Sequence, residues 1–128
     1  MLVFWVFIGC ALGGMIRYTT SEFLALYQKG DLPWGTLAVN LTGSFLIGLA
    51  TPLFYSLETL PQQPFTLFLM TGLLGGLTTF STLSWQTLML GENKGWRRAG
   101  TNILGNLIPA IGLCALGLEL GGLWQNGI

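Results

Sequence analysis

Amides and hydroxyls recur at helical spacing on three apolar stretches of the sequence. Residues four apart share a face of a helix, and two stretches use that spacing: Thr36, Asn40 and Ser44 in one, Asn102 and Asn106 in the other. Such groups commonly join neighbouring helices in membranes by hydrogen bonds. Three polar helix faces at related depths in the membrane are more typical of a pathway that polar side chains line. The third stretch contributes Thr78, Thr79, Ser81, Thr82 and Ser84.

The third stretch, GGLTTFSTLSWQ, also places two adjacent glycines, Gly75 and Gly76, ahead of a threonine pair. A helix can break at membrane depth only where protein or a cavity satisfies the freed main-chain groups. Freed carbonyls suit a cation, whereas hydroxyl and amide donors suit a small anion. The ring edge of Phe80 carries the positive end of its quadrupole and adds to the anion preference. These residues predict a broken helix beside an ion pathway.

The elements that carry these residues are predicted to cross a membrane. Of the 128 residues, 52% are hydrophobic and 8% are charged, whereas soluble domains carry about 25% charged residues. A spanning helix needs about 20 apolar residues, so the length allows four. We expect an all-α membrane protein whose third helix is broken at mid-membrane. It forms a single four-helix transmembrane domain over 1–128, with spans at 2–26, 35–55, 64–90 and 96–123.

Glycine pairs at four-residue spacing predict how these spans pack, because small residues let helices approach closely in lipid. Trp85 lies away from the predicted membrane interfaces, where tryptophan is usually enriched, and is expected to pack inside the protein. The glycine pairs are Gly9 and Gly13, Gly72 and Gly76, and Gly117 and Gly121.

Several kinds of chemistry have no candidate residues. The sequence contains no histidine, no phosphate-binding glycine loop and no nucleophile–base pair, so we expect no enzyme and no nucleic-acid partner. Proton-coupled transporters place an acid within the membrane, and the nearest candidate, Glu119, falls toward the end of the fourth span. Cys10 and Cys114 lie in apolar segments, where thiols behave as small hydrophobes. No disulfide and no thiolate metal site are expected.

Arg17 is the one charge predicted well inside a span. At a helix centre it would cost about 2.5–3.5 kcal/mol on insertion scales, although its long side chain could reach the interface. A vestibule for ions and a structural anchor are both consistent with this position.

These residues resemble the CrcB/Fluc family of fluoride channels over essentially the whole chain. The matching motifs are GGMIRY (13–18), GTLAVNLTGSFLIG (35–48) and GGLTTFST (75–82), with Asn102 and Asn106 on the fourth span. The resemblance implies an antiparallel dimer of four-helix subunits with two fluoride pores. It also implies a central sodium ion, structural and not transported, bound by main-chain carbonyls of Gly75 and Thr78. The residues implied along the anion pathway are Asn40, Ser44, Phe80, Ser81, Thr82 and Asn106.

The chain departs from the family pattern at three pore positions. Leu83 stands where a second pore phenylalanine is usual, which removes an electropositive ring edge. Ala110 and Cys114 stand where the family often has hydroxyls on the fourth span, and Pro109 replaces a common glycine. These differences bear on whether every pore built from this subunit conducts.

The basic residues of the loops predict a fixed orientation. Lys29, Lys94, Arg97 and Arg98 fall in the first and third loops, whereas the second loop, which holds Glu58, and both termini have no Lys or Arg. Basic loops stay inside, so both termini are expected outside the cell inner (plasma) membrane. The antiparallel mate is then an oppositely oriented paralogous subunit; the alternative is a homodimer that tolerates this bias.

The leading functional hypothesis is a passive fluoride channel that lowers cytoplasmic fluoride. The alternative is a non-conducting or half-degraded partner subunit of a heterodimeric channel, favoured by Leu83, Ala110 and Cys114. A small four-helix drug exporter is the least favoured hypothesis, because it requires a membrane carboxylate in the first helix, and that helix has none before Glu22.

Overall fold

The computed structural model describes residues 1–55 and 63–127, and every regular element in them is helical. The first, second and last helices are α1 (Leu2–Tyr27), α2 (Trp34–Tyr55) and α6 (Trp96–Asn126). The third segment, Pro64–Lys94, is subdivided, and all four are long and apolar enough to cross a membrane. The expected all-helical class with four membrane-spanning segments is confirmed. Glu58 lies outside the described residues.

The third segment is built from four consecutive pieces. It begins with α3 (Pro64–Thr66), where proline occupies the first turn, a position that needs no main-chain donor. A π-helical stretch, η2 (Leu67–Leu74), and α4 (Gly75–Leu77) follow, and α5 (Phe80–Lys94) completes the segment. Gly95 separates α5 from α6 with a φ of 98°, a conformation that glycine adopts without steric penalty.

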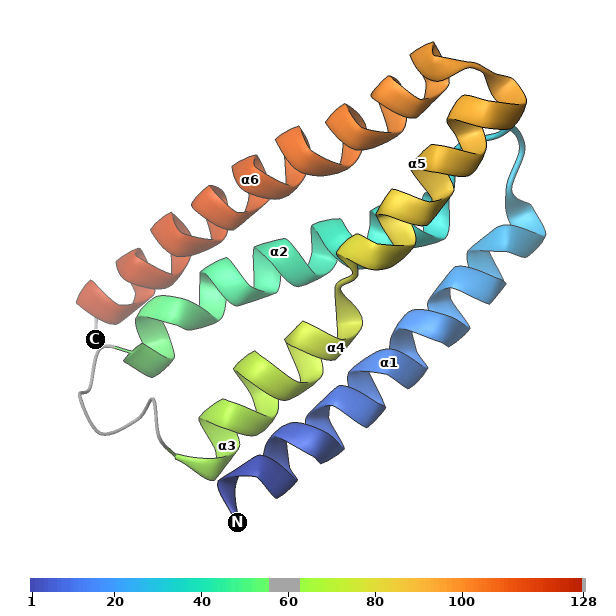
Figure 1. Ribbon diagram of the computed structural model, residues 1–128. Helices are drawn as coiled ribbons and strands as arrows, with labels where there is room; N and C mark the ends of the chain where they lie inside the picture. The colour runs from blue at the N-terminus through green and yellow to red at the C-terminus, as the bar shows by residue number, and fades with distance from the viewer. Residues whose placement is uncertain (56–62, 128) are drawn as a thin grey trace.

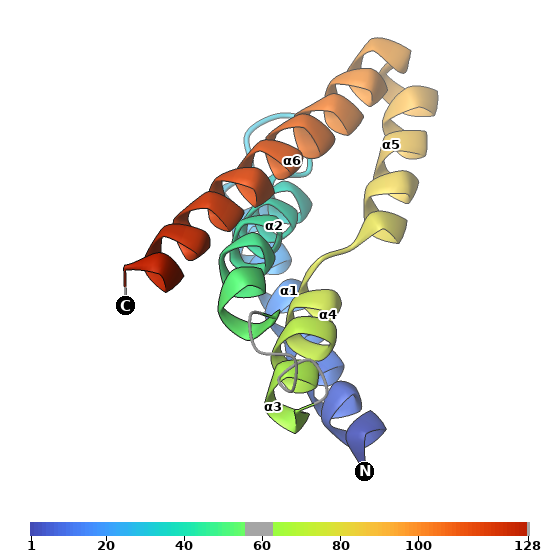
Figure 2. The same cartoon turned by 90° about the vertical axis from the view of Figure 1, so that its left-hand side faces the viewer.

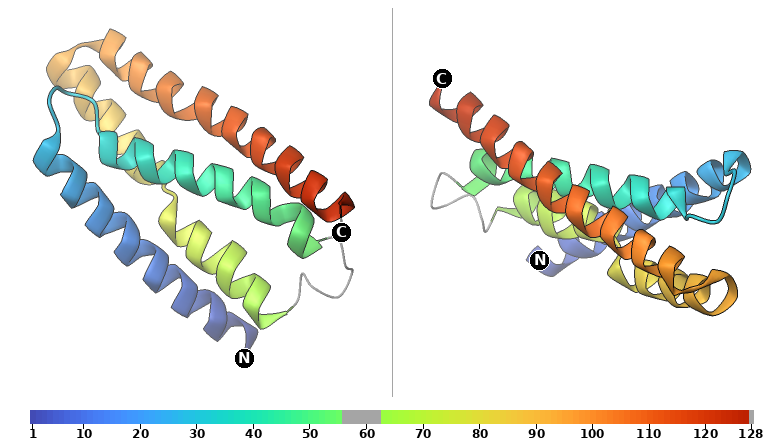
Figure 3. Two further views of the ribbon diagram at one scale, coloured as in Figure 1. Left: turned by 180° about the vertical axis from the view of Figure 1, so that it is seen from behind. Right: turned by 90° about the horizontal axis from the view of Figure 1, so that it is seen from above.

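Glycines allow close packing between two pairs of helices: the third segment with α1, and α6 with α2. A Cβ on Gly72 would lie 2.8 Å from the Cα of Gly9, and one on Gly76 would lie 2.6 Å from the Cys10 carbonyl oxygen. The first half of the third segment therefore packs backbone to backbone on α1, on the same side of the molecule (Figure 1). On the other side, a Cβ on Gly117 would lie 2.7 Å from the Leu49 nitrogen, where α6 packs on α2 (Figure 3). The close packing predicted from these glycine pairs is confirmed.

The third segment leaves helical conformation for two residues. Thr78 has φ −81° and ψ 154°, and Thr79 has φ −151° and ψ 121°, so both are extended. Beyond them the chain changes direction, and α5 stands apart from α2 and approaches α6 (Figure 2). The chief packing partner of α5 is α6. The break thus separates a half that packs on α1 from a half that packs on α6.

A charged cluster closes one end of the bundle. Asp31, in the turn before α2, forms ion pairs with Lys94 at the end of α5 and with Arg98 in α6. The Lys94 Nζ to Asp31 Oδ1 distance is 3.3 Å. The start of α1 and the end of α6 lie at the opposite end of the bundle (Figure 1). The ends of the bundle therefore differ in charge among the described residues, with the loop cations gathered at one of them.

Trp85 does not pack inside the chain as expected, because 62% of its surface is exposed. The buried residues of α5 are Leu83, Thr87, Leu90 and Gly91, which share the face that packs on α6. Trp85 is two residues from Leu83, which is roughly half a turn in a helix of 3.6 residues per turn. The Trp85 side chain therefore projects from the opposite face of α5.

Candidate functional site

The break in the third segment is bridged by the side chain of Asn40. The main-chain N–H of Thr79 donates to Asn40 Oδ1 with an N to O distance of 2.8 Å, and Asn40 Nδ2 donates to the Thr79 carbonyl oxygen at 3.1 Å. Both residues are buried. One amide side chain on α2 thus satisfies both main-chain groups of the residue at which the helix is interrupted.

The break takes the usual helical donors away from the carbonyls of residues 75–78, and two of those donors bond to side chains. In an uninterrupted helix the N–H of Thr79 would bond to the Gly75 carbonyl, but here it donates to Asn40. The N–H of Thr82 would likewise bond to the Thr78 carbonyl, but it donates to the Thr79 hydroxyl, which caps α5, at 3.2 Å. Side chains thus take the two amides that would otherwise bond to the Gly75 and Thr78 carbonyls.

The hydrogen-bond network of Asn40 extends to α6. Asn40 Nδ2 donates to Asn106 Oδ1 at 3.2 Å, and Asn106 Nδ2 donates to the Asn102 carbonyl oxygen at 3.1 Å. Asn102 Nδ2 in turn donates to Thr87 Oγ1 on α5 at 2.9 Å. Four buried side chains therefore connect α2, the break, α6 and α5. Thr87 belongs to this chain of bonds although its sequence position, one helical turn after Leu83, marks it only as part of a buried face.

Both hydrogens of the Asn40 amide are engaged in these bonds, one with Thr79 and one with Asn106. The NH₂ group of Asn106 carries two hydrogens and donates one hydrogen bond within the protein, to the Asn102 carbonyl oxygen. Asn106 thus keeps a donor hydrogen, whereas Asn40 keeps none.

A groove of about 500 Å³ runs along this network between α5, α2 and α6. Phe80 lies at its edge with 78% of its surface exposed, whereas Leu83 is only 7% exposed and forms part of the groove wall. The groove is open on the single chain. Its lining includes predicted pathway residues and two of the predicted departures: Asn40, Ser44, Thr78, Phe80, Leu83, Asn106 and Ala110.

The remaining predicted positions lie beside the groove or away from it. The Ser81 and Thr82 hydroxyls are in the first turn of α5, within hydrogen-bond distance of the Thr79 hydroxyl. Cys114 is half-buried, and its carbonyl contacts Gly48 of α2. Arg17 is half-buried, and the ion pairs of the described residues do not include it.

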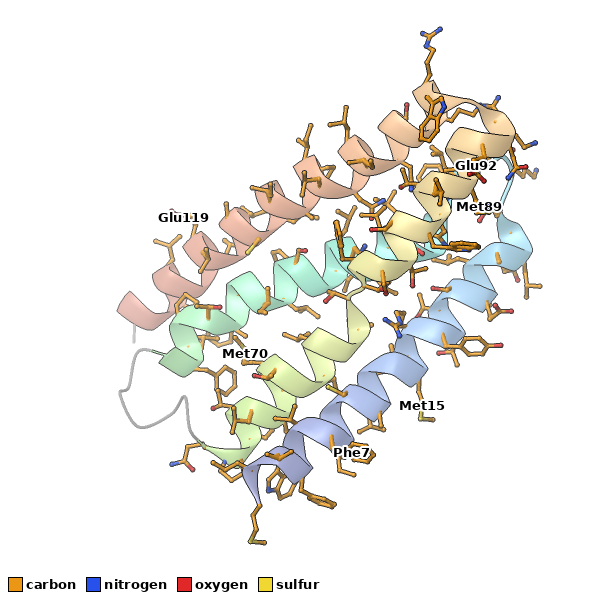
Figure 4. The ribbon with its side chains drawn as sticks, in the orientation of Figure 1. Phe7, Met15, Met70, Met89, Glu92 and Glu119 are labelled. Atoms are coloured by element: carbon orange, nitrogen blue, oxygen red, sulfur yellow. The ribbon has the colours of Figure 1, made fainter. Side chains whose placement is uncertain are left out.

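Acidic and thiol ligands do not converge anywhere in the described residues. No group of three or more His, Cys, Asp or Glu side chains is close enough there to bind a metal ion. Glu119 is exposed on the side of α6 turned away from α2 (Figure 4).

Comparison with known proteins identifies the family. Residues 4–118 match the family model described as "CrcB-like protein, Camphor Resistance (CrcB)". The chain belongs to the CrcB family. Two similar curated proteins are each named "Fluoride-specific ion channel FluC". One from Opitutus terrae is 38% identical over 133 residues, covering 99% of this chain and 94% of its own. One from Methylobacterium radiotolerans is 42% identical over 123 residues, covering 95% and 85%.

Membership of the CrcB family confirms the predicted resemblance and the expectation of a channel protein in place of an enzyme. The matched range, residues 4–118, includes part or all of each of the four candidate membrane spans. In this CrcB-family chain the third motif contains the break itself, and the second motif contains the asparagine that bridges it.

We predict that Asn40→Ala will destabilise the break without affecting the rest of the bundle to the same degree. It leaves the N–H of Thr79 buried without a partner, and such a loss costs about 1–3 kcal/mol. The Thr79 carbonyl, at the N-cap of α5, keeps the first bond of that helix. Hydrogen exchange followed by mass spectrometry on the purified chain should show faster exchange of the amides at 79–82.

Ser44→Ala is the matched control, because it removes one polar atom one turn further along the same face of α2. Its exchange pattern should resemble that of the unchanged chain. Equal protection of residues 79–82 in Asn40→Ala would contradict the bridging role.

Proposed function

We propose that this chain is a subunit of a passive fluoride-selective channel that lowers cytoplasmic fluoride. The observation that carries the proposal is the bridged break: side chains take the amides of Thr79 and Thr82, which in an unbroken helix would bond to the Gly75 and Thr78 carbonyls. An exposed phenylalanine, Phe80, begins the helix immediately beyond. The relatives named as fluoride-specific channels supply the identity of the ion.

A structural sodium ion, bound by these carbonyls and not transported, belongs to the proposal. Carbonyl oxygens are hard, neutral ligands that replace water around such a cation. The donor set fits, because the two carbonyls expected from the motif are the two whose helical amides are diverted. Bound sodium would supply a fixed positive charge at the break.

The channel is proposed to be an antiparallel dimer with the break at mid-membrane and two pores between the subunits. The groove beside Phe80 is open on the single chain, so a pathway along it needs a second subunit to close it off from lipid. A pair related by a twofold axis creates the same groove twice, because each subunit contributes the same surface.

The residues beside this groove can replace water around a small anion. Phe80 offers its ring edge, Ser44, Ser81 and Thr82 offer hydroxyls, and Asn106 keeps one donor hydrogen. Asn40 has both hydrogens engaged. We therefore assign Asn40 to the positioning of the break, and the anion contacts to its neighbours.

We predict that the purified chain, reconstituted in liposomes, will release fluoride in a sodium-dependent manner and exclude chloride. A fluoride-selective electrode measures the efflux, with sodium replaced by a larger monovalent cation in the control. Chloride efflux as fast as fluoride efflux would contradict the proposed selectivity.

We predict that Phe80→Ile will slow fluoride efflux while leaving dimer assembly intact. The substitution keeps an apolar side chain of similar bulk but removes the electropositive ring edge. Trp85→Leu, five residues further on and also exposed, is the control for the loss of an aromatic ring on α5. Unchanged efflux in Phe80→Ile would remove Phe80 from the pathway.

A second candidate function is a non-conducting or half-degraded partner in a heterodimer. Two observations favour it. Leu83 and Ala110 line the groove with apolar groups, and the loop cations Lys94 and Arg98 gather with Asp31 at one end of the bundle. Because basic loops remain inside, this subunit would insert with both termini outside the plasma membrane, beside a paralogous subunit of opposite orientation.

This second candidate predicts that a C-terminal topology reporter on this chain, expressed alone, will report mainly the outside of the membrane, whereas an antiparallel homodimer of the chain predicts equal labelling of both sides. Replacing Lys94, Arg97 and Arg98 by glutamine should move the reporter signal toward equal labelling of both sides. Equal labelling of the unchanged chain would exclude a fixed orientation and favour the antiparallel homodimer.

A further inference from the structure

We propose that Thr87 and Asn102 are positioning residues whose buried hydrogen bond fixes α5 against α6 and so sets the place of Phe80 beside the ion pathway. The proposal rests on the proposed channel function for its consequence, although the bond itself is a feature of the fold.

The half-helix α5 carries the groove residue Phe80 at its first position and depends on α6 for its location. It packs chiefly on α6 (Figure 2), and its buried face is formed by Leu83, Thr87 and Leu90. Apolar contacts such as those of Leu83 and Leu90 tolerate small shifts along the helix axis. A single polar pair on this face can therefore determine the register.

The bond between Thr87 and Asn102 is that pair. Asn102 Nδ2 donates to Thr87 Oγ1 at 2.9 Å. Asn102 is 3% exposed and Thr87 is 8% exposed. Among the described residues it is the one side-chain hydrogen bond between α5 and α6. A slide of one helical turn, about 5.4 Å, would leave both groups buried without partners, and such an arrangement is strongly disfavoured.

The same turn of α6 also supports the break. The carbonyl oxygen of Asn102 accepts from Asn106 Nδ2, and Asn106 Oδ1 accepts from Asn40. The first two turns of α5, from Phe80 to Thr87, are thus held at both ends by groups anchored on one stretch of α6. Without the Thr87 hydroxyl, this part of α5 is held at the break alone, and its next polar attachment is the ion pair of Lys94 with Asp31.

The test compares Thr87→Val with Thr87→Ser in the full chain reconstituted in lipid. Valine keeps the shape of threonine but removes the oxygen, whereas serine keeps the oxygen. Thr101→Val is the matched control, because Thr101 is exposed on the neighbouring position of α6 and its hydroxyl bonds within its own helix. The two measurements are sodium-dependent fluoride efflux and amide hydrogen exchange over residues 79–86.

In Thr87→Val we expect efflux to fall and exchange over 79–86 to rise, each by about tenfold, because an unmade buried hydrogen bond shifts a local equilibrium by that order. Thr87→Ser and Thr101→Val should retain the original behaviour. The double variant Thr87→Val/Asn102→Leu should be no worse than Thr87→Val, since partners of one bond are not additive and the Asn102 carbonyl is kept.

Equal loss of efflux in Thr87→Ser and Thr87→Val would overturn the proposal, because the hydroxyl would then not be the cause. Unchanged exchange over 79–86 in Thr87→Val would also overturn it. If the unchanged chain gives no efflux, the proposed channel function of this chain alone fails. The exchange comparison then still decides whether the pair fixes α5.

Discussion

A main-chain amide or carbonyl that leaves a helix within an apolar structure must find another partner, because water is not available there to replace the lost bond. This constraint governs the third segment of the protein. At Thr79 both main-chain groups bond to the amide of Asn40, and at the start of α5 the Thr79 hydroxyl receives the Thr82 amide. The interruption is therefore stable because α2 supplies, at one point, a side chain with a donor and an acceptor side by side.

The same bonds give the break its chemical character. Each amide that is taken by a side chain leaves a carbonyl without its helical donor, and the two carbonyls concerned belong to Gly75 and Thr78. In the proposed channel, a cation bound by carbonyls would lie beside an anion path lined by donor groups, and neither ion would need a charged side chain. The low charge of the sequence is consistent with it.

Close helix packing makes this geometry possible. Gly72 and Gly76 let the first half of the third segment contact the backbone of α1, while Gly117 and Gly121 do the same for α6 on α2. The second half, α5, has no such glycine contact with α1 or α2 and packs on α6. Besides the apolar side chains Leu83 and Leu90, polar contacts at the break, at Thr87 and at Asp31 hold it in position.

The sequence by itself indicated that the chain lies in a membrane, how many times it crosses it, and where the third span is interrupted. Composition and the length of the apolar stretches require four membrane helices, and adjacent glycines ahead of a threonine pair mark the interruption. That Asn40 and Phe80 belong to one site was implied by the resemblance to the fluoride-channel family, whereas the number of spans and the break come from the residues themselves. These features are local, so that they can be read from residue types and spacing.

Only the tertiary structure decided what each side chain does there. Helical spacing places Asn40 on a polar face, but its two donor hydrogens are committed only because α6 brings Asn106 within 3.2 Å of it. Trp85 was expected inside, and its exposure follows from α5 turning its Leu83 face toward α6. Nothing in the sequence indicated that Thr87 forms a hydrogen bond to α6, apart from its position on the buried face of α5. Partners across helices depend on the rotation and register of each helix, and those are set by packing of the whole bundle.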